Sequence, residues 1–213
     1  MESLHRHEDY GQQALEEFDV AADPIKQFSL WLADAEQAGI FEPNAFVLGT
    51  VDHAGKPTAR TVLLRGVDAD GFYFYTNYAS RKGHAIGEGS PVTMVFGWYP
   101  QFRQVLVEGI ATRVNPTESD AYFNTRPRDS QISAWASNQS QPVHNRAALE
   151  AQYDEARERF AAGDIPRPEF WGGYRIVPTR IEFWKGRSNR LHDRIEFSRP
   201  APDMDWTVRR LQP

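Results

Sequence analysis

The sequence predicts an α+β protein built on an antiparallel β-sheet or barrel. Two observations support this class: segments rich in Val, Leu, Phe, Tyr and Thr gather toward both ends of the chain, and helical patterns lie between them. Strands do not alternate with helices, so a chain of βαβ units is not expected. The 213 residues, 40% hydrophobic and 25% charged, can bury a continuous core without disulfides or a structural metal.

The elements follow in order along the chain. Residues 1–22 are polar, which predicts a mobile N-terminal arm before a single domain over residues 23–213. A helix begins at Asp23-Pro24 and ends at Gly39. Next come strands at 45–51, 58–67 and 72–77, a short helix from Ser80 to Glu88, and paired strands at 92–99 and 101–114. Helical patterns dominate 116–162, broken at Pro127 and near 138–142, and strands return at 174–184, 193–198 and 206–211.

Composition excludes several classes of function. The chain has no cysteine, which rules out disulfides, thiolate nucleophiles and zinc–thiolate sites. Its net charge of −5 argues against generic nucleic-acid binding. The N-terminus lacks the apolar run of a signal peptide, and no apolar run is long enough for a membrane helix, so we expect a cytoplasmic protein with no membrane partner.

Several familiar site motifs are missing from the sequence. There is no G-x-G-x-x-G after the first strand, no P-loop and no G-x-S-x-G elbow. His5 and His7 could touch a metal, but in a mobile arm we expect them to be solvated, and no metal site is predicted. Any phosphate or cofactor must therefore be held by side chains and by amides at a sheet edge.

Cations gather in four short segments of this acidic chain. Such clusters suggest pockets for small anions such as phosphate esters. The alternative, solvated surface charges with scattered acidic partners, stays open for each cluster taken alone. The clusters are Arg60/Arg65, Arg81/Lys82, Arg126/Arg128 and Arg187/Arg190/Arg194.

Two of these segments belong to predicted strands or to their ends. In a strand over residues 60–65, Arg60 and Arg65 would lie on opposite faces and at opposite ends. Residues 75–82 place hydroxyl groups and the Arg81-Lys82 pair where a strand ends and a helix begins, a position that favours an anion. Flanking arginines on a solvent-facing strand would explain the first segment equally well.

The other two segments suggest a phosphate clamp and a cationic face. Tyr122 and Arg126 are four residues apart, so we expect them on one helical face, with Ser130 at the start of the next helix. A surface turn with an N-cap would fit this pattern nearly as well. If residues 190–194 are extended, Arg190, His192 and Arg194 share one face and call for an anionic partner, unless they lie on an exposed edge strand.

Nine stretches, in this order and spacing, resemble the pyridoxamine/pyridoxine 5′-phosphate oxidase family over nearly the whole chain from Asp23. They are Arg60–Leu64, Phe74-Tyr75-Thr76-Asn77, Ser80-Arg81-Lys82, Arg103-Gln104-Val105, Arg126–Ile132, Asn138-Gln139-Ser140, Phe170-Trp171-Gly172-Gly173, Glu182-Phe183-Trp184 and Arg190–Arg194. The resemblance implies a split β-barrel homodimer with flavin mononucleotide (FMN) at the subunit interface. It also implies oxidation of pyridoxamine 5′-phosphate, pyridoxine 5′-phosphate or both to pyridoxal 5′-phosphate, with dioxygen as acceptor.

The same resemblance assigns site residues. Arg190 and His192 are implied as catalytic residues that lie over the substrate ring. The substrate phosphate would be held by Arg65, Tyr122, Arg126 and Ser130. The FMN contacts would be Arg60, Val62, Leu63, Tyr75, Thr76, Arg81, Lys82, Gln104, Gln139, Ser140, Trp184 and Arg194. Hydride transfer to the flavin would then depend mainly on positioning.

Two departures from the family pattern bear on substrate binding. Arg65 stands where the family usually has lysine, and its planar guanidinium needs a different geometry to bind phosphate. The arm of many members carries Arg-x-x-Tyr as a lid, whereas this chain has His7-Glu8-Asp9-Tyr10 with Arg6 one place out of step. The resemblance thus leaves lid function open.

Two alternatives to this function remain. A flavin oxidase of the phenazine-biosynthesis type would act on a different ring; Tyr122, Arg126 and Ser130 argue for a phosphorylated substrate, and Arg65 is the one residue that argues the other way. A non-catalytic flavin-binding module would need no cations over the open flavin face, which Arg190 and His192 provide.

Overall fold

The computed structural model describes residues 2–5 and 9–213 of the chain. Residues 1 and 6–8, which include His7 and most of the stretch compared with a lid, lie outside the described residues. The helical elements are η1 Glu2–His5, α1 Pro24–Gln37, α2 Arg81–Ile86, η2 Tyr99–Gln101, α3 Pro116–Thr125, α4 Arg128–Ala136, α5 Arg146–Arg159 and η3 Ser188–Arg190. None of the helices in this described part is long and apolar enough to cross a membrane.

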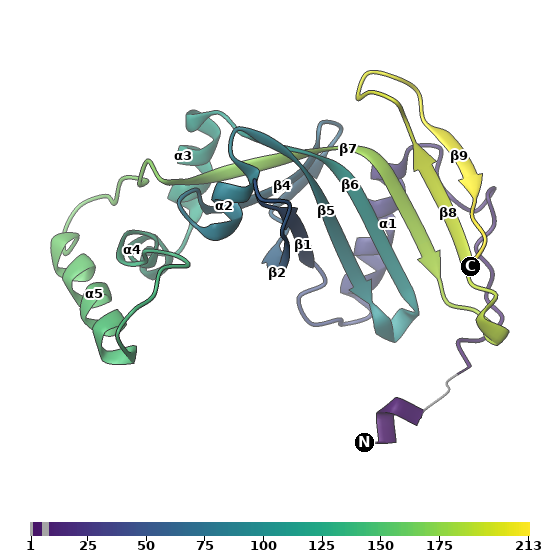
Figure 1. The fold of residues 1–213 in the computed structure, drawn as a ribbon, viewed down its shortest axis with the longest axis horizontal. Coiled ribbons are helices and arrows are strands. Elements are labelled where there is room, and N and C mark those ends of the chain that lie inside the picture. Colours follow the sequence, from purple (N-terminus) through teal and green to yellow (C-terminus); the bar gives the residue numbers. More distant parts are fainter. Residues whose placement is uncertain (1, 6–8) are drawn as a thin grey trace.

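An antiparallel sheet forms the centre of the molecule (Figure 1). Its path runs β2-β1-β5-β6-β7-β4-β3, and β8 and β9 continue from β7. The predicted α+β class is therefore confirmed. The strands are β1 Ala45–Val51, β2 Pro57–Leu63, β3 Gly66–Asp68, β4 Gly71–Asn77, β5 Gly89–Trp98, β6 Arg103–Arg113, β7 Trp171–Lys185, β8 Asp193–Ser198 and β9 Thr207–Arg210.

The strand predicted over residues 58–67 is in fact two strands, and this break shapes the sheet. β2 pairs with β1 up to Leu63, and β3 pairs with β4 from Gly66 onward, so the two strands lie at opposite ends of the sheet path. Only Leu64 and Arg65 join them, and their N–H groups bond Asn44 and Tyr73 respectively. Because two residues link the two ends, the sheet must curl toward a barrel that stays open between β2 and β3.

Strand β7 connects the two halves of the molecule. One of its edges pairs with β6 along nearly its whole length. The other edge pairs first with β4, over residues 171–176, and then with β8, over residues 180–185. In Figure 1, β7 accordingly runs from the side of α3 to the side of β8.

Helix α1 closes the main core over the sheet. The Asp23 side chain accepts a hydrogen bond from the N–H of Ile25 at 2.8 Å, which caps the helix as predicted. Phe28 and Trp31 of α1 are buried, and the ring of Phe28 lies 4.8 Å from that of Phe96 in β5. These edge-to-face aromatic contacts fix the helix against the barrel.

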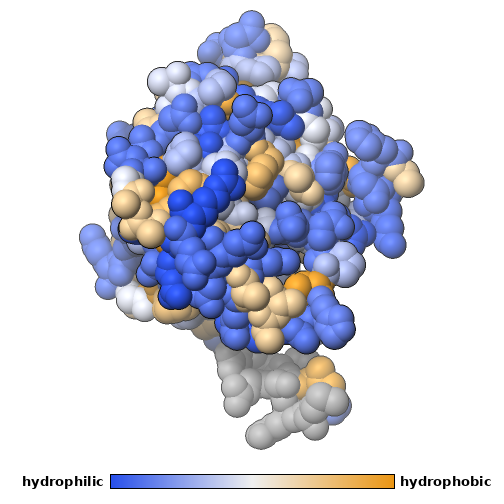
Figure 2. Space-filling view, turned by 90° about the vertical axis from the view of Figure 1, so that its left-hand side faces the viewer, coloured by the Kyte–Doolittle hydropathy of each residue, from blue (hydrophilic) through white to orange (hydrophobic). Residues whose placement is uncertain are grey.

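A second, smaller core lies among α3, α4 and α5. It packs Phe123, Ile132 and Phe160 around Trp171, the first residue of β7. The outside of this end of the molecule is mostly hydrophilic, with small scattered apolar patches (Figure 2). The helices thus pack on the sheet around Trp171, and Tyr122 of α3 also stacks on Tyr75 of β4.

Residues 9–22 of the N-terminal arm lie along the β8–β9 side of the molecule (Figure 1). Leu15 is buried, and its N–H donates to Asp193 at 3.0 Å. Arg210 of β9 pairs with both Glu16 and Glu17. The expected mobility of the arm stays a prediction, and these contacts are what such motion would have to break.

Candidate active site

A first group of predicted residues meets at the junction of β4, α2 and the loop after α4. The Nζ of Lys82 donates to Oε1 of Gln139 at 2.7 Å, and the hydroxyl of Thr76 donates to the same oxygen at 3.2 Å. The backbone N–H of Arg81 donates to Oγ of Ser140 at 3.2 Å. Five of the predicted FMN contacts, separated by up to 64 positions in the sequence, are therefore side by side.

Arg60, Arg81 and Lys82 form what we call the first cation cluster. Burial lowers the pKa of Arg60, and the charge of Arg81 lowers it further. Burial also lowers the pKa of Lys82 to about 8, with a contribution from Arg60. Within the described part of the chain, no carboxylate forms an ion pair with any of the three. Arg60 is half-buried, Lys82 is buried and Arg81 is exposed. Like charges brought together in this way favour the binding of an anion.

Arg60 is held by the neighbouring strands. Its Nη1 donates to the carbonyl of Leu48 at 2.8 Å and to Oγ1 of Thr50 at 2.9 Å. The strand register places Arg60 of β2 opposite Leu48 of β1, so the guanidinium folds back across that strand. Val62 and Leu63, also predicted to contact FMN, are half-buried at the end of the same strand.

Arg65 and Arg126 form a second cation cluster beside a stack of aromatic rings. The Tyr75 and Tyr122 rings stack at 3.7 Å, and the Arg126 guanidinium lies 4.6 Å from the Trp171 ring centroid. Burial lowers the pKa of Arg126; Tyr122 opposes this shift and Arg65 adds to it. Among the residues that the structure describes, none accepts a hydrogen bond from the buried Nη1 of Arg126. A buried guanidinium group left in this state is suited to an incoming anion.

The predicted helical contact between Tyr122 and Arg126 is wrong in its geometry. Helix α3 ends at Thr125, and Arg126 has an extended backbone with φ −72° and ψ 146°. Arg126 approaches Tyr122 because both lie over Trp171, not because they share a helical face. Ser130 lies in the first turn of α4, half-buried, as predicted for a helix start.

A third group lies on strands β6, β7 and β8. Gln104, Trp184 and Arg194 are direct neighbours in the strand register, so their side chains share one face of the sheet. The guanidinium of Arg194 is bound by Glu182, through Nε at 2.8 Å and Nη2 at 2.9 Å. We call Gln104, Trp184 and Arg194 the β6–β8 row.

His192 lies next to this row and has a defined hydrogen-bonding state. Its Nδ1 accepts a hydrogen bond from the backbone N–H of Arg187 at 3.1 Å. A neutral imidazole in this arrangement carries its proton on Nε2, which can then act as a donor. The His192 ring centroid is 4.8 Å from that of Trp184 and 5.7 Å from that of Tyr10.

The predicted extended face of Arg190, His192 and Arg194 is wrong. Arg190 belongs to the short helix η3, and both Asn189 and Arg190 have positive φ, at 57° and 60°. This left-handed backbone turns the chain before β8 begins at Asp193. Arg190 is therefore exposed, while Arg194 faces Glu182 on the sheet.

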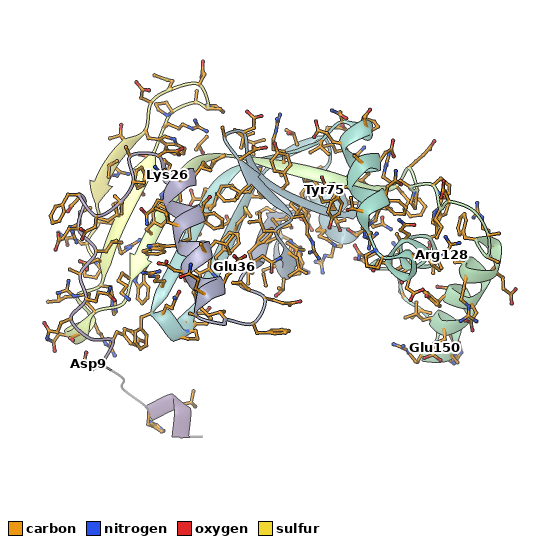
Figure 3. The ribbon with its side chains drawn as sticks, turned by 180° about the vertical axis from the view of Figure 1, so that it is seen from behind. Asp9, Lys26, Glu36, Tyr75, Arg128 and Glu150 are labelled. Carbon is orange, nitrogen blue, oxygen red and sulfur yellow. The ribbon has the colours of Figure 1, made fainter. Side chains whose placement is uncertain are left out.

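Within one chain, the two cation clusters are far from the β6–β8 row. Thr76 lies opposite Gly172 on β7, whereas Arg194 lies opposite Trp184. The two positions are separated by about 40 Å along the strand, at about 3.3 Å per residue. In Figure 3, Tyr75 lies in the middle part of the molecule, and Asp9, which bonds Ser188 near His192, lies well away from it, toward the end opposite to Glu150.

Some residues of these groups carry no predicted role. Trp171 and Glu182 belong to recognised motifs, but only the fold shows that Trp171 lies under Arg126 and that Glu182 binds Arg194. Tyr10 contacts His192 from the arm. Over the described residues, no group of His, Asp and Glu side chains could hold a metal ion.

Two family models cover most of the chain. Residues 32–160 match the model described as pyridoxamine 5′-phosphate oxidase. Residues 171–213 match the model described as the pyridoxine 5′-phosphate oxidase C-terminal dimerisation region, which supports assembly as a homodimer.

Curated relatives and solved structures agree with these models. Pyridoxine/pyridoxamine 5′-phosphate oxidase of Rubrobacter xylanophilus is 51% identical, covering 96% of this chain and 94% of the relative. The protein of the same name from Vibrio campbellii is 45% identical over the full length of both. The structure of PhzG from Burkholderia lata, in complex with tetrahydrophenazine-1-carboxylic acid, superposes with a TM-score of 0.88 at 30% identity, covering 96% of this chain and 100% of that one. The chain belongs to the pyridoxamine 5′-phosphate oxidase family.

Proposed function

We propose that the protein is an FMN-dependent oxidase that converts pyridoxamine 5′-phosphate, pyridoxine 5′-phosphate or both to pyridoxal 5′-phosphate, with dioxygen as acceptor. The observation that carries this proposal is the pair of separate cation clusters. Arg60, Arg81 and Lys82 form the first, and Arg65 and Arg126 form the second. A phosphorylated cofactor and a phosphorylated substrate need one such cluster each. A cytoplasmic location remains the expectation from the sequence.

The residues present fit FMN. The three cations have no paired carboxylate in the described part of the chain, which suits a phosphate dianion, because several charge-assisted hydrogen bonds would replace mutual repulsion. Gln139 and Ser140 extend the cluster with neutral polar groups. Tyr75, adjacent to Thr76, leads from this cluster to the second one through its stacking on Tyr122. The two anion sites are thus linked by a short aromatic bridge.

The substrate phosphate belongs at the second cation cluster in this proposal. Arg126 offers its unpartnered Nη1, Arg65 adds a second guanidinium, and Tyr122 and Ser130 add hydroxyl groups. Where the family usually has a lysine ammonium group, Arg65 supplies a planar guanidinium group. We therefore expect phosphate to be bound here by two guanidinium groups.

A homodimer completes the site in this proposal. The β6–β8 row, His192 and Arg190 are too far from the two cation clusters to serve the same cofactor within one chain. They lie in the region that matches the dimerisation model, residues 171–213, apart from Gln104 of the paired strand β6. A partner subunit would bring its own row to the clusters of the first subunit, so that both chains contribute to each FMN.

The residues of the chain then have distinct tasks in the reaction. A bound flavin supplies the two-electron acceptor for the substrate, and dioxygen takes up those electrons. The cation clusters fix the two phosphates and so limit the motion of the rings between them. His192 donates a hydrogen bond from Nε2 toward the substrate, and Arg190, exposed on its turn, supplies a positive charge over the ring.

An anaerobic titration tests the reaction class. The purified protein should be yellow, and pyridoxamine 5′-phosphate added without oxygen should bleach it, with colour restored by air. A yellow protein that pyridoxamine 5′-phosphate and pyridoxine 5′-phosphate both fail to bleach would reject the proposed substrate. Bleaching by tetrahydrophenazine-1-carboxylic acid instead would favour a substrate like the compound bound in the PhzG structure.

A further inference from the structure

A network of six charged side chains lies on one face of strands β6 to β9. The carboxylates are Glu108, Glu182 and Glu196, and the guanidinium groups are Arg180, Arg194 and Arg209. Glu182 and Glu196 are almost completely buried, at 3% and 1% exposure. Three negative and three positive charges balance within the network, so each buried carboxylate has its counter-charge.

Glu182 and Glu196 occupy equivalent places in this network. Both bind Arg180, which lies between them. Each also binds one further arginine: Glu182 binds Arg194, and Glu196 binds Arg209. The two glutamates are thus matched in burial, in charge and in number of partners, and they differ in the arginine that they hold.

The bond geometry leaves part of Arg194 available. Glu182 binds Nε and Nη2, and the carbonyl of Gln212 accepts from Nη1 at 3.0 Å. A guanidinium has five N–H groups, so two remain without a partner among the described residues 2–5 and 9–213. The hydrogen bonds to Glu182 raise the pKa of Arg194, which keeps the group charged. Because Glu182 and Gln212 already fix this guanidinium, it loses little conformational freedom when a ligand binds its remaining N–H groups.

We infer that Glu182 is a positioning residue for flavin binding: it holds Arg194 so that the free N–H groups are presented beside Gln104 and Trp184. The inference rests on the proposed function, in which Arg194 contacts FMN. Glu182 lies two residues before Trp184 on β7 and therefore on the same face of the sheet. It touches the ligand only through Arg194.

The test compares Glu182→Gln with the matched control Glu196→Gln in the full-length protein. Each substitution removes one buried charge and leaves Arg180 with one carboxylate fewer, so a general effect on the network should be equal in the two variants. We expect Glu182→Gln to raise the FMN dissociation constant about tenfold, equivalent to about 1.4 kcal/mol. We expect Glu196→Gln to stay within about twofold of wild type. The dissociation constant is measured by quenching of FMN fluorescence, and thermal unfolding without FMN is recorded for both.

A double variant checks that the effect passes through Arg194. In an Arg194→Met background, Glu182→Gln should weaken FMN binding by less than about twofold, because the group that it positions is gone. If Glu182→Gln does not fold, Glu182→Asp and Glu196→Asp replace the pair, since they keep the charge and shorten the reach.

The outcomes separate the inference from the function on which it rests. Equal losses in the Glu182 and Glu196 variants, no loss at Glu182, or full additivity with Arg194→Met would overturn the inference. Wild-type protein that binds FMN but oxidises no B6 phosphate would overturn the proposed substrate and leave the inference standing. Wild-type protein that does not bind FMN would overturn both.

Discussion

The ionisation of Lys82 gives FMN binding a defined dependence on pH. Burial beside Arg60 lowers the pKa of Lys82 to about 8, so raising the pH from 7 to 9.5 removes a proton from the first cation cluster. A bound phosphate dianion favours the charged form of Lys82 and raises its pKa in the complex. Binding above pH 8 must therefore take up a proton, and affinity must fall as the pH rises.

The magnitude follows from the fraction of Lys82 that remains protonated. With a pKa of about 8, that fraction falls to about one tenth at pH 9, so the FMN dissociation constant should rise about tenfold there and about thirtyfold at pH 9.5. Phosphate esters have their second pKa near 6, so FMN stays a dianion throughout. Fluorescence titrations of FMN with apoprotein between pH 7 and 9.5 measure this slope.

Lys82→Arg is the matched control. Arginine stays charged over the whole range, so its dissociation constant should be nearly constant from pH 7 to 9.5. A wild-type dissociation constant that does not change with pH, or an equally steep slope in Lys82→Arg, would refute the assignment of Lys82 to the phosphate site.

Three further predictions concern the substrate, the reaction and the fold. Arg126→Met should raise KM for pyridoxamine 5′-phosphate about 10- to 100-fold, because it removes charge-assisted hydrogen bonds worth about 1.5–3 kcal/mol, and it should leave FMN affinity unchanged. Oxygen-uptake kinetics measure KM, and a value equal to that of wild type would contradict phosphate binding at the second cation cluster. Arg190→Ala should retain FMN but lose most turnover, and normal turnover in a yellow variant would remove Arg190 from the reaction. Gly83→Ala should destabilise the protein by about 1–3 kcal/mol, because the added Cβ would lie 2.1 Å from the carbonyl oxygen of Tyr78. Urea unfolding measures this loss, and Gly89→Ala is the comparison, because its added Cβ would lie 3.5 Å from Cγ2 of Thr112, an ordinary contact distance.

The sequence predicts the elements well where local signals agree. Asp23-Pro24 marks the start of α1, and Ser80 caps α2 through a bond to the N–H of Gly83 at 3.3 Å. These signals depend on neighbours within one turn, so no tertiary information is needed. The same reasoning fails at Leu64-Arg65, because the break there arises from pairing with two strands at opposite ends of the sheet.

For the site residues, too, the predictions that depend on tertiary contacts could not be made from local signals. The proximity of Lys82 to Gln139 could be expected only from the family resemblance, since the two are far apart in the sequence. The face assigned to Arg190 and Arg194 fails because the pattern gives no sign of the left-handed turn at Asn189. The counter-ion of Arg194 could not be predicted either, because Glu182 meets it only through the β7–β8 register.

Strand β7 separates the second cation cluster from Arg190 within one chain, and this separation has a genetic consequence. If each reaction centre draws Arg126 from one chain and Arg190 from the other, two different inactive variants can restore each other. Arg126→Met and Arg190→Ala subunits, mixed after unfolding and refolded together, would form hybrid dimers with one intact centre and one doubly defective centre. Random pairing would return activity to about one quarter of all centres, from parents that have almost none. Two harmful alleles of such a gene would then complement each other in one cell.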